Sequence, residues 1–522
     1  MLRYFIGVCI LLYVNAYDPL PKPFYIYSGG NVFNLVENIK IQNPYPQCNL
    51  LNDAIKRFTK YLYNSIYINY EGPINQSISK ISISMVTNCT DDENTKLWPT
   101  ENMIESYQME VTKDGIFIMS KEVWGILRAL QTLFQMAYRI SSGALCINET
   151  VLYDQARFQF RGLMLDTSRH FLPVQTILDN IELMSISKLN VFHWHIVDDE
   201  SFPYQSKTFP DLSDKGSFHR FSHVYTQKDV LRILDFARRR GIRVVPEFDS
   251  PGHSLSWGKG QKNLLTPCYS GSKPSGSFGP IDPTLDQTYT FLNKLFKEVI
   301  EIFPDTLLHL GGDEVNFNCW KSNPRIVNFT VKNGFPNDFA KLQGYYMIKL
   351  TNLVQGLAVK KKDFKTMVWQ EVFDNKNEVD QKLTIINVWK GEDKWQQEMA
   401  EVTKSNYTAV LSSCWYLNYI SYGIDWHKYY TCDPQNFDGK KDLVIGGEAC
   451  MWGEYVDATN VISRTWPRAS VVAERLWSNQ SVTDLNDMAN RLHEFRCRLV
   501  INGFNAETMN GGGTYCNIPG EI

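Results

Sequence analysis

An apolar stretch that ends in two glycines and two adjacent carboxylates is the first candidate for a reactive site in this sequence. Leu307–Leu310 has the length and composition of a buried strand, and Gly311 and Gly312 allow the backbone to leave it sharply. Asp313 and Glu314 follow directly. A bare Asp-Glu pair is usually part of a solvated loop, but aromatic residues and a cysteine follow this pair closely. We therefore predict that Asp313 and Glu314 are the catalytic pair.

Polar and aromatic residues also follow the other apolar stretches of the chain. In chain order they are Asp166 and Arg169, then His193, His195, Asp198, Asp199 and Glu200, then Glu247, Asp249 and His253, then Trp369, Gln370 and Glu371, then Trp389, then Tyr416 and Asn418, and finally Glu448, Trp452 and Glu454. In a parallel barrel the C-terminal ends of the strands meet at one rim. Carboxylates, an arginine and repeated tryptophans on such a rim are typical of a carbohydrate pocket.

One chemistry for this rim is metal-dependent hydrolysis. His193 and His195 stand at i and i+2, which places both imidazoles on one face of a strand at a spacing that suits a metal. Such a site needs further histidines on later strands, and after His309 the chain contains only His427 and His493. We therefore predict a structural or hydrogen-bonding role for His193 and His195, and no metal or other cofactor.

Two glycosidase chemistries remain open from the residues alone. A two-carboxylate glycosidase needs a nucleophile from another strand, for which Glu371, Glu448 and Glu454 are candidates. In substrate-assisted hydrolysis of a 2-acetamido sugar, the substrate's own acetamido oxygen attacks C1, and two carboxylates suffice. Asp313 would then orient the acetamido group and Glu314 would be the acid. Neighbouring negative charge and an apolar wall predict a raised pKa that keeps Glu314 protonated.

The elements that must position these residues follow a repeated strand–helix pattern from residue 156 to 522. Strands are expected at 162–167, 189–196, 241–248, 306–310, 366–370, 383–389, 409–414 and 444–451, and helices at 174–187, 227–240, 286–303, 339–357 and 395–404. Eight such units predict a (β/α)8 TIM barrel, whereas a doubly wound sheet lacks its G-x-G-x-x-G after the first strand. The segment 271–279 (GSKPSGSFG) is expected to be a flexible loop.

A smaller α+β domain is predicted before the barrel, over residues 17–155. The alternation in 81–85 and 107–111 predicts half-buried strands, and 123–138 (VWGILRALQTLFQMAY) predicts an amphipathic helix. Met1–Ala16 has the basic start, apolar core and small final residue of a secretory signal peptide. No later apolar run is long enough for a membrane span, and a net charge of −3 gives no reason to expect nucleic-acid binding.

A secretory route makes the cysteines disulfide candidates and the N-x-S/T sequons glycosylation candidates. The chain contains 11 cysteines, of which Cys9 lies in the signal. The sequons begin at Asn75, Asn88, Asn148, Asn328, Asn406 and Asn479. Spacing alone does not determine the cysteine pairing, although Cys414 and Cys432 flank the loop after the seventh strand and could pair.

Several stretches together resemble the family-20 β-N-acetylhexosaminidases, in particular the animal lysosomal subunits. They are 161–170 (RGLMLDTSRH), 191–199 (VFHWHIVDD), 247–253 (EFDSPGH), 309–315 (HLGGDEV), 368–372 (VWQEV) and 446–454 (GGEACMWGE). The resemblance covers nearly the whole chain after the signal. It implies an exo-acting enzyme that removes terminal β-linked GlcNAc or GalNAc with retention of configuration, through an oxazolinium intermediate formed by the substrate.

The resemblance also implies roles for single residues. Glu314 would be the general acid/base, Asp313 the carboxylate that orients the acetamido group, and Tyr416 the donor to its oxygen. Asp198 and His253 would position and tune Glu314. The residues expected to hold or enclose the sugar are Arg169, Trp369, Trp389, Asn418, Trp452 and Glu454. Core packing is the alternative for each tryptophan.

The family further suggests the disulfides Cys48–Cys89, Cys268–Cys319 and Cys497–Cys516, a homodimer, and a lysosomal or secreted location. Its natural substrate would be a glycan or glycoconjugate. Two rivals are kept: a dedicated chitooligosaccharide or N-glycan trimming enzyme, and a sugar-binding protein on an inactive barrel. A binding protein has no use for a general acid, so the intact Asp313–Glu314 pair argues against the second.

The chain departs from the family after Tyr416. Related subunits carry either Asp-Leu, which accompanies neutral substrates, or Asn-Arg, which accompanies anionic ones such as 6-sulfated sugars. This chain has Asn418 followed by Tyr419. A neutral amide repels an anionic substituent less than Asp would, yet Tyr419 supplies no cation to bind one. We therefore predict mainly neutral substrates with some tolerance of sulfate.

Overall fold

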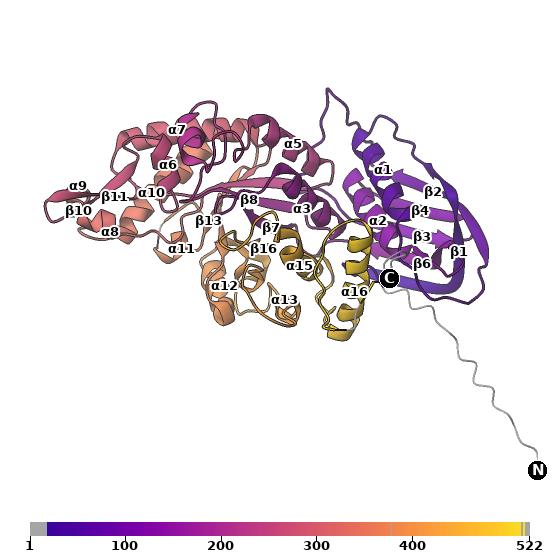
Figure 1. The fold of residues 1–522 in the computed structure, drawn as a ribbon. Helices are drawn as coiled ribbons and strands as arrows, with labels where there is room; N and C mark the ends of the chain where they lie inside the picture. The colour runs from indigo at the N-terminus through magenta and orange to yellow at the C-terminus, as the bar shows by residue number, and fades with distance from the viewer. Residues whose placement is uncertain (1–17, 377, 513–514, 517–522) are drawn as a thin grey trace, which may run out of the picture.

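The computed structural model describes residues 18–376, 378–512 and 515–516. The predicted signal peptide lies outside these residues. The chain forms a six-stranded sheet with two helices, followed by a closed eight-stranded barrel with its surrounding helices (Figure 1). The TIM barrel and the smaller α+β part before it, both predicted from the sequence, are confirmed. None of the helices among the described residues is long and apolar enough to cross a bilayer.

The N-terminal sheet has the strand order β1-β2-β4-β3-β6-β5. Its elements are β1 (Tyr25–Gln42), α1 (Asn49–Tyr63), β2 (Gln76–Met85), β3 (Tyr107–Thr112), β4 (Gly115–Ser120), α2 (Val123–Met136), β5 (Tyr138–Arg139) and β6 (Leu145–Asp154). The two predicted half-buried strands are present in β2 and β3, where apolar residues are buried on one face and polar residues point to water on the other. The apolar face packs on the two helices.

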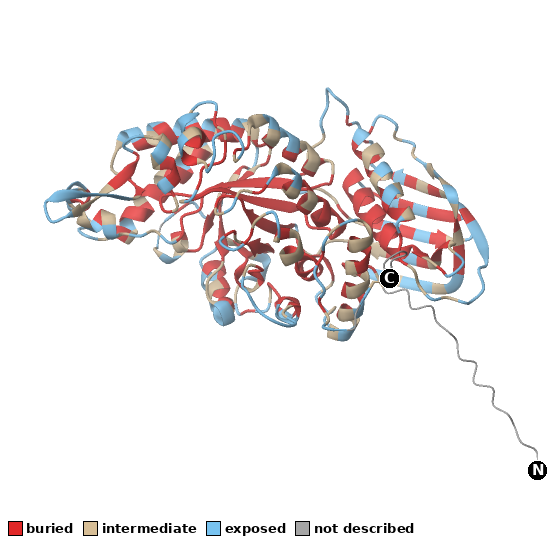
Figure 2. Cartoon of the chain, in the orientation of Figure 1, coloured by how far each residue is buried: buried red, intermediate tan, exposed pale blue. Residues whose placement is uncertain are grey.

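The helix predicted at 123–138 forms as α2, and its sequence is amphipathic, but both its apolar and its polar side are buried. It packs on α1 and on β3 and β4, and it lies between the sheet and the barrel (Figures 1 and 2). Its polar residues are buried with partners. Arg128, for example, pairs with Glu105 and donates to the backbone carbonyls of Arg240 and Gly241 in the barrel. The polar side of α2 therefore faces partners in the barrel instead of solvent.

All eight predicted barrel strands form, and every neighbouring pair is parallel. They are β7 (Phe160–Asp166), β8 (Val191–Val197), β9 (Arg243–Phe248), β12 (Leu307–His309), β13 (Lys365–Trp369), β14 (Thr384–Val388), β15 (Thr408–Leu411) and β16 (Val444–Met451). The barrel closes where β16 pairs with β7. Residues of 409–414 beyond Leu411 leave the predicted strand, because a short 3-10 helix begins at Ser413.

The five predicted barrel helices are present as α3 (Val174–Ile186), α5 (Gln227–Arg238), α7 (Asp286–Ile302), α10 (Phe339–Leu357) and α12 (Trp395–Lys404). Local signals fix where they begin. Thr226 and Asp229 form a capping box at the start of α5, and the Asp338 carboxylate accepts from Lys341 N at the start of α10. The remaining helices are α4 (Asp211–Gly216), α6 (Leu255–Gly260), α8 (Asn318–Ser322), α9 (Pro324–Lys332), α11 (Glu371–Asp374), α13 (Trp426–Thr431), α14 (Val461–Thr465), α15 (Arg468–Trp477), α16 (Leu485–Ile501) and the 3-10 turns η1 (Glu392–Lys394), η2 (Ser413–Trp415) and η3 (Lys441–Leu443).

The barrel interior is apolar at the bottom and polar above. The lower layer consists of Phe160, Val191, Val245, Leu307, Met367, Ile385 and Val410. Two positions further along their strands, the interior residues are His193, Glu247, His309 and Asn387, and β16 adds Glu448; all five are buried. Hydrogen bonds join His193 to Glu247 and Glu448, and Asn387 to Glu448, whereas His309 Nε2 has no partner among the described residues. This polar layer supports the rim where the predicted site residues lie.

The segment 271–279, expected to be a flexible loop, is mostly part of a β-hairpin. Strands β10 (Leu265–Ser270) and β11 (Lys273–Ile281) pair antiparallel. The hairpin stands out at the end of the barrel farthest from the N-terminal sheet (Figure 1). The disulfide Cys268–Cys319 fastens it to α8. The prediction of a flexible loop, made from glycine and serine content, was therefore wrong, because tertiary contacts stabilise a strand here.

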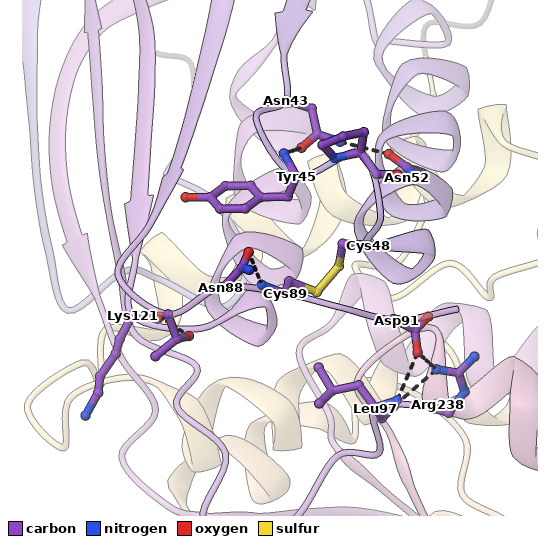
Figure 3. The surroundings of a disulfide bond; sticks show 12 residues. Asn43, Tyr45, Cys48, Asn52, Asn88, Cys89, Asp91, Leu97, Lys121 and Arg238 are labelled. Carbon is purple, nitrogen blue, oxygen red and sulfur yellow. Dashed lines mark hydrogen bonds and ion pairs between the residues drawn. A yellow bond between two sulfur atoms is a disulfide. The ribbon is translucent and has the colours of Figure 1, made fainter. Parts of the chain in front are cut away.

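The three disulfides that the family resemblance implied are all formed, and Cys414 is bonded to Cys432. The Cys48–Cys89 bridge joins the start of α1 to the loop after β2 (Figure 3). Close to it, Asp91 accepts from the Arg238 guanidinium of the barrel helix α5, which links the two parts of the molecule (Figure 3). Among the described residues, Cys146 and Cys450 are free and buried.

Helix α16 follows the barrel in sequence but packs on the N-terminal part of the chain (Figure 1). Arg498 donates to the backbone carbonyls of Phe134 and Ala137 at the end of α2. Cys497 joins a small apolar cluster with Val32 and Tyr138 of the sheet. The N-terminal sheet is therefore completed by a helix from the far end of the sequence.

Candidate active site

A cavity of about 160 Å³ opens at the C-terminal ends of the barrel strands. It is lined by Arg169, Asp313, Glu314, Trp389, Tyr416, Asn418, Tyr419, Trp452 and Glu454. Eight of these nine were predicted as site residues from the sequence, and Tyr419 is the one that adjoins them. Of the other predicted residues, Trp369 is buried beneath Trp452, with ring centroids 5.8 Å apart, and Asp198 and His253 lie behind the carboxylate pair.

The turn after β12 gives the two adjacent carboxylates different surroundings. Gly311 has a φ of 66°, and a side chain there would overlap the carboxylate of Asp249, so glycine is required. Glu314 itself adopts a positive φ of 45°. Asp313 is 6% exposed, and its buried Oδ1 makes no hydrogen bond within the described part of the chain. The Glu314 side chain is 60% exposed. One carboxylate is thus buried at the cavity wall and its neighbour faces open space.

Asp198 and His253 connect the pair to the barrel interior. His253 Nδ1 lies 3.0 Å from Asp198 Oδ1, and its Nε2 lies 3.7 Å from Asp313 and 3.6 Å from Glu314. Burial alone would lower the pKa of His253, but the charge of Asp313 and the contacts with Asp198 and Glu314 raise it well above its usual value. A charged imidazole therefore stands between three carboxylates.

The expectation that Glu314 has a raised pKa was wrong for the open site. The His253 ring, by its hydrogen-bonding contact and then by its charge, lowers the pKa of Glu314 below its ordinary value, against a smaller effect of burial. The sequence argument counted the neighbouring carboxylate and an apolar wall. It did not place a cationic imidazole beside a carboxyl that is largely exposed to water.

Arg169 is the cation of the cavity, and several acids hold it in place. Its guanidinium lies 2.8 Å from Asp166, 2.9 Å from Asp198 and 4.0 Å from Glu454. The same group lies over the Trp452 ring at 5.0 Å from the centroid. A fixed fork of N–H donors beside an exposed carboxylate suits sugar hydroxyl groups, which both donate and accept hydrogen bonds.

Aromatic rings form the remaining walls. Trp389 and Tyr416 are nearly parallel, with an interplanar angle of 6° and centroids 6.3 Å apart, and Trp452 lies 6.4 Å from Tyr416 at an angle of 58°. The Trp389 indole donates to Glu371 at 2.8 Å, and the Trp369 indole donates to Glu247 at 2.6 Å. The polar edges of these rings are thus bonded, which leaves apolar faces to line a small enclosure.

The sequence matches two protein-family models whose descriptions agree with a sugar-hydrolysing site at this position. Residues 158–480 match the model of the glycosyl hydrolase family 20 catalytic domain, and residues 19–136 match a domain described as beta-acetyl hexosaminidase like. The chain belongs to glycosyl hydrolase family 20. It is a β-N-acetylhexosaminidase, an exo-acting glycosidase of the substrate-assisted kind.

Relatives support the family 20 assignment over nearly the full length. The chain is 48% identical to the mouse beta-hexosaminidase subunit beta over 480 residues, which cover 91% of this chain and 88% of the relative. It is 47% identical to the bovine subunit alpha, with 91% and 89% covered. Among solved structures, the chitobiase of Flavobacterium johnsoniae superposes with a TM-score of 0.81 at 28% identity, covering 94% of this chain and 73% of that one.

In this family 20 barrel, the histidine pair has the hydrogen-bonding role predicted for it. Both nitrogens of His193 contact the carboxylates of Glu247 and Glu448, and both nitrogens of His195 contact Glu247 and Asp198. Burial alone would lower the pKa of His193, but the two glutamates raise it to about 9. Glu247 thus anchors a line of contacts that runs through His195 to Asp198.

Asp249 is a residue that the sequence placed on the predicted rim without assigning it a role. It is buried, its Oδ1 accepts from Gly312 N at 2.8 Å, and burial together with the charge of Asp313 raises its pKa well above the usual range. Asp249 therefore holds the turn and lies close to Asp313. The signal was available, because Asp249 follows Glu247 at i+2 and therefore lies on the same side of the chain.

The candidate nucleophiles of a two-carboxylate mechanism are poorly placed in this family 20 site. Glu448 is fully buried and bonded to His193 and Asn387 in the barrel interior. Glu371 accepts from Trp389 and pairs with Lys390 at 3.2 Å, and it does not line the cavity. Glu454 does line it, but about half of its side chain is exposed on the Arg169 side.

Glu371 leads to a prediction about stability. Burial and the charge of Asp313 raise its pKa to about 7, with Lys390 opposing. A carboxyl whose pKa is higher in the folded state stabilises the fold at low pH and loses that contribution as pH rises from about 4.5 to about 7. Glutamine does not titrate, so the variant does not lose this contribution. The free energy of unfolding of Glu371→Gln, minus that of the wild type, should therefore rise by on the order of 2 kcal/mol when the pH is raised from 5 to 8.

Urea unfolding at the two pH values measures this difference. Glu401→Gln is the matched control, because Glu401 is exposed on α12. Parallel pH curves for the wild type, Glu371→Gln and Glu401→Gln would contradict the prediction.

Proposed function

We propose that Asp313 and Glu314 divide the work of substrate-assisted hydrolysis in this cavity. The observation that carries the proposal is the contrast between them: Asp313 has a buried oxygen without a hydrogen-bond partner among the described residues, whereas Glu314 is exposed. A buried, unpartnered carboxylate oxygen calls for a donor, and the acetamido N–H of a bound sugar is one. An exposed carboxyl can reach the bond to the leaving group.

The proposed reaction has two steps. In the first, the acetamido oxygen attacks C1 while Glu314 gives its proton to the glycosidic oxygen, so the C1–O bond breaks and an oxazolinium forms. Asp313 accepts the acetamido N–H and balances the positive charge. In the second step, Glu314 takes a proton from water, and that water attacks C1 and reopens the ring. Two inversions at C1 give net retention.

His253 and Asp198 are proposed to control the proton of Glu314. In the open site, His253 lowers the pKa of Glu314. A bound sugar would remove water from the exposed Glu314 carboxyl, and loss of water raises a carboxyl pKa. Substrate binding would therefore favour the protonated form that the first step requires.

The remaining cavity residues are proposed to hold the sugar. Arg169 and Glu454 would bond its hydroxyl groups, and Tyr416 would donate to the acetamido oxygen as it becomes the nucleophile. Trp389 and Trp452 would enclose the acetamido group, with Trp369 supporting Trp452 from below. Asn418 would face the outer hydroxyl groups, since its buried Oδ1 has no partner among the described residues.

A GlcNAc-thiazoline, a stable mimic of the oxazolinium, tests the proposal directly. Strong competitive inhibition of hydrolysis of an aryl β-GlcNAc is expected, because the mimic presents the same fused ring to Asp313 and Tyr416. Turnover without inhibition would point to an enzymic nucleophile. Absence of turnover at acidic and neutral pH would favour a sugar-binding protein instead.

Neutral GlcNAc and GalNAc are the proposed substrates, with some tolerance of a 6-sulfate. Arg169 is the only cation among the residues that line the cavity, and four acids already hold it. We expect kcat/KM on an aryl β-GlcNAc to exceed that on its 6-sulfated form by about tenfold, since the sulfate would gain no charged partner. A preference for the sulfated substrate would contradict this prediction.

A lysosomal or secreted location and a homodimer are proposed as well. The disulfides and the sequons support the secretory route. Four of the six sequon asparagines are exposed, and Asn148 and Asn479 are half-buried. The mouse and bovine relatives are named as subunits, which supports an assembly of more than one chain. The domain boundary near residue 155 remains a proposal, and it falls between β6 and β7.

A further inference from the structure

One imidazole and two carboxylates converge at the wall of the cavity. His253 Nε2 lies 3.7 Å from an oxygen of Asp313 and 3.6 Å from an oxygen of Glu314. The ligand atoms of the three side chains all lie within 4.8 Å of one another. His253 Nε2 and Asp313 Oδ1 are both buried without a hydrogen-bond partner in the described part of the chain. Nitrogen and oxygen atoms arranged in this way are suitable ligands for a divalent metal ion.

The spacing of these atoms fits Zn²⁺. This ion binds histidine nitrogen and carboxylate oxygen at about 2.0–2.2 Å, which places the ligand atoms of a tetrahedral site about 3.3 Å apart. His253 Nε2 lies only slightly farther than this from the two carboxylates, and the exposed Glu314 side chain is free to close the gap. We propose that His253, Asp313 and Glu314 form a binding site for Zn²⁺, and that the bound ion inhibits the enzyme. Water from the cavity supplies the fourth ligand.

His253 is already oriented as a metal ligand. Its Nδ1 lies 3.0 Å from Asp198 Oδ1. A histidine that binds zinc commonly donates its other N–H to a carboxylate, which fixes the ring and makes the ligating nitrogen more basic. Zn²⁺ binds the neutral imidazole, so a proton leaves His253 for water as the ion binds.

The charges around the site also favour a cation. Among the described residues, Arg169 and His253 are surrounded by six acidic side chains, none farther than 4.0 Å from one of the two: Asp166, Asp198, Glu200, Asp313, Glu314 and Glu454. Acids thus outnumber basic groups at this rim. A divalent cation beside Asp313 and Glu314 would reduce the excess of negative charge.

Two other groups of possible ligands in the described part of the chain are less suited to a metal. They are His193, Glu247 and His309, and Asp198, Asp249 and His253. Both nitrogens of His193 already contact carboxylates, and the whole first group is buried in the barrel. In the second group, Asp249 already accepts from the Gly312 N–H. Of the three groups, the one with Asp313 and Glu314 borders the cavity through which an ion can enter.

Bound Zn²⁺ acts here as an inhibitor and not as a cofactor. With the ion in place, Asp313 is no longer available to the acetamido N–H of a sugar. Glu314 holds the metal and has no proton to give to the glycosidic oxygen. The ion and the substrate therefore exclude each other. The inhibition rests on the proposed function, whereas the binding of the ion does not.

Calorimetric titration of ZnCl₂ into the full-length enzyme at neutral pH measures the binding directly. We expect one site per chain. Saturation with GlcNAc-thiazoline should abolish the binding, because the mimic occupies the space beside Asp313. The same ion should inhibit hydrolysis of an aryl β-GlcNAc competitively. Mg²⁺ should neither bind nor inhibit, since it prefers oxygen ligands in an octahedral arrangement.

Two variants remove one ligand each. His253→Gln should weaken Zn²⁺ binding by at least about 100-fold, because loss of a ligand costs more than loss of a supporting residue. Glu314→Gln, at an exposed position, should weaken it to a similar degree. His219→Gln is the matched control and should bind as the wild type does. His219 is exposed and lies near His223, with ring centroids 6.4 Å apart, so this pair is the alternative site for zinc on the surface.

The outcomes separate the metal site from the proposed function. Absence of binding to the wild type would overturn the site, and so would simultaneous binding of Zn²⁺ and the thiazoline. Equal affinity in the wild type and His253→Gln would overturn it too, as would loss of binding in His219→Gln. An enzyme that loses Zn²⁺ binding in His253→Gln, yet ignores the thiazoline, would retain the site and overturn the proposed function.

Discussion

Glu314→Gln is expected to lower kcat on a β-GlcNAc disaccharide by about 10³- to 10⁴-fold, because the leaving oxygen then departs without a proton. The loss should be much smaller on an aryl glycoside with an acidic leaving group, since a good leaving group needs little help. Glutamine has nearly the same shape, and the Glu314 side chain is largely exposed, so the fold should be unaffected. The measurement is kcat for a series of leaving groups of increasing acidity.

The control for this series is Glu401→Gln, because Glu401 is exposed on α12, away from the cavity. It should leave the dependence on leaving group unchanged. If Glu314→Gln slowed all leaving groups equally, Glu314 would not be the general acid.

Asp313→Asn should slow every substrate, activated ones included, by about 10²- to 10³-fold in kcat. The reason is that formation of the oxazolinium itself depends on a carboxylate beside the acetamido N–H. The unpartnered Oδ1 of Asp313 is buried, and the charge of Asp313 also acts on Asp249 and His253. An amide cannot balance the developing positive charge, and its NH₂ group would oppose the N–H of the substrate.

The two variants should differ in how the loss of kcat depends on the leaving group. Glu314→Gln should lose most on poor leaving groups, whereas Asp313→Asn should lose kcat on all of them. Azide or another external nucleophile would not rescue Asp313→Asn, because no enzymic nucleophile is missing. Retention of full activity on activated substrates by Asp313→Asn would refute the substrate-assisted assignment of this residue. Thermal unfolding of both variants checks that the loss is chemical.

The barrel was predictable because each of its strands is a short apolar run with a sharp change of composition after it. In parallel strands that are buried on both faces, such runs are nearly continuous, and the chemistry follows at one end. Leu307–Leu310 and Val444–Met451 are examples, and the structure gives β12 and β16 within two residues of the predicted bounds. The cavity residues were predictable for the same reason, with the family motifs supplying their roles.

The sequence did not show which residues from distant parts of the chain surround each side chain in the fold. Helix α2 is buried all round because two other parts of the chain cover it, and no local pattern records that. The lowered pKa of Glu314 comes from His253, a residue of another strand end. Asp249 matters through its contact with the Gly311–Gly312 turn, which becomes visible only when the two strands stand side by side. The residue roles themselves remain predictions for the variants above.

The place of α16 has a consequence for the order of events during synthesis. The N-terminal sheet is translated first. Its contacts with Arg498 and Cys497 of α16 can form only after the whole barrel has been translated. The barrel also closes late, because its first strand, β7, pairs with its last strand, β16 (Val444–Met451). We therefore expect neither part to be fully packed before α16 and β16 have been made. Truncations that remove α16 should therefore destabilise the N-terminal sheet, the part of the molecule that was translated first.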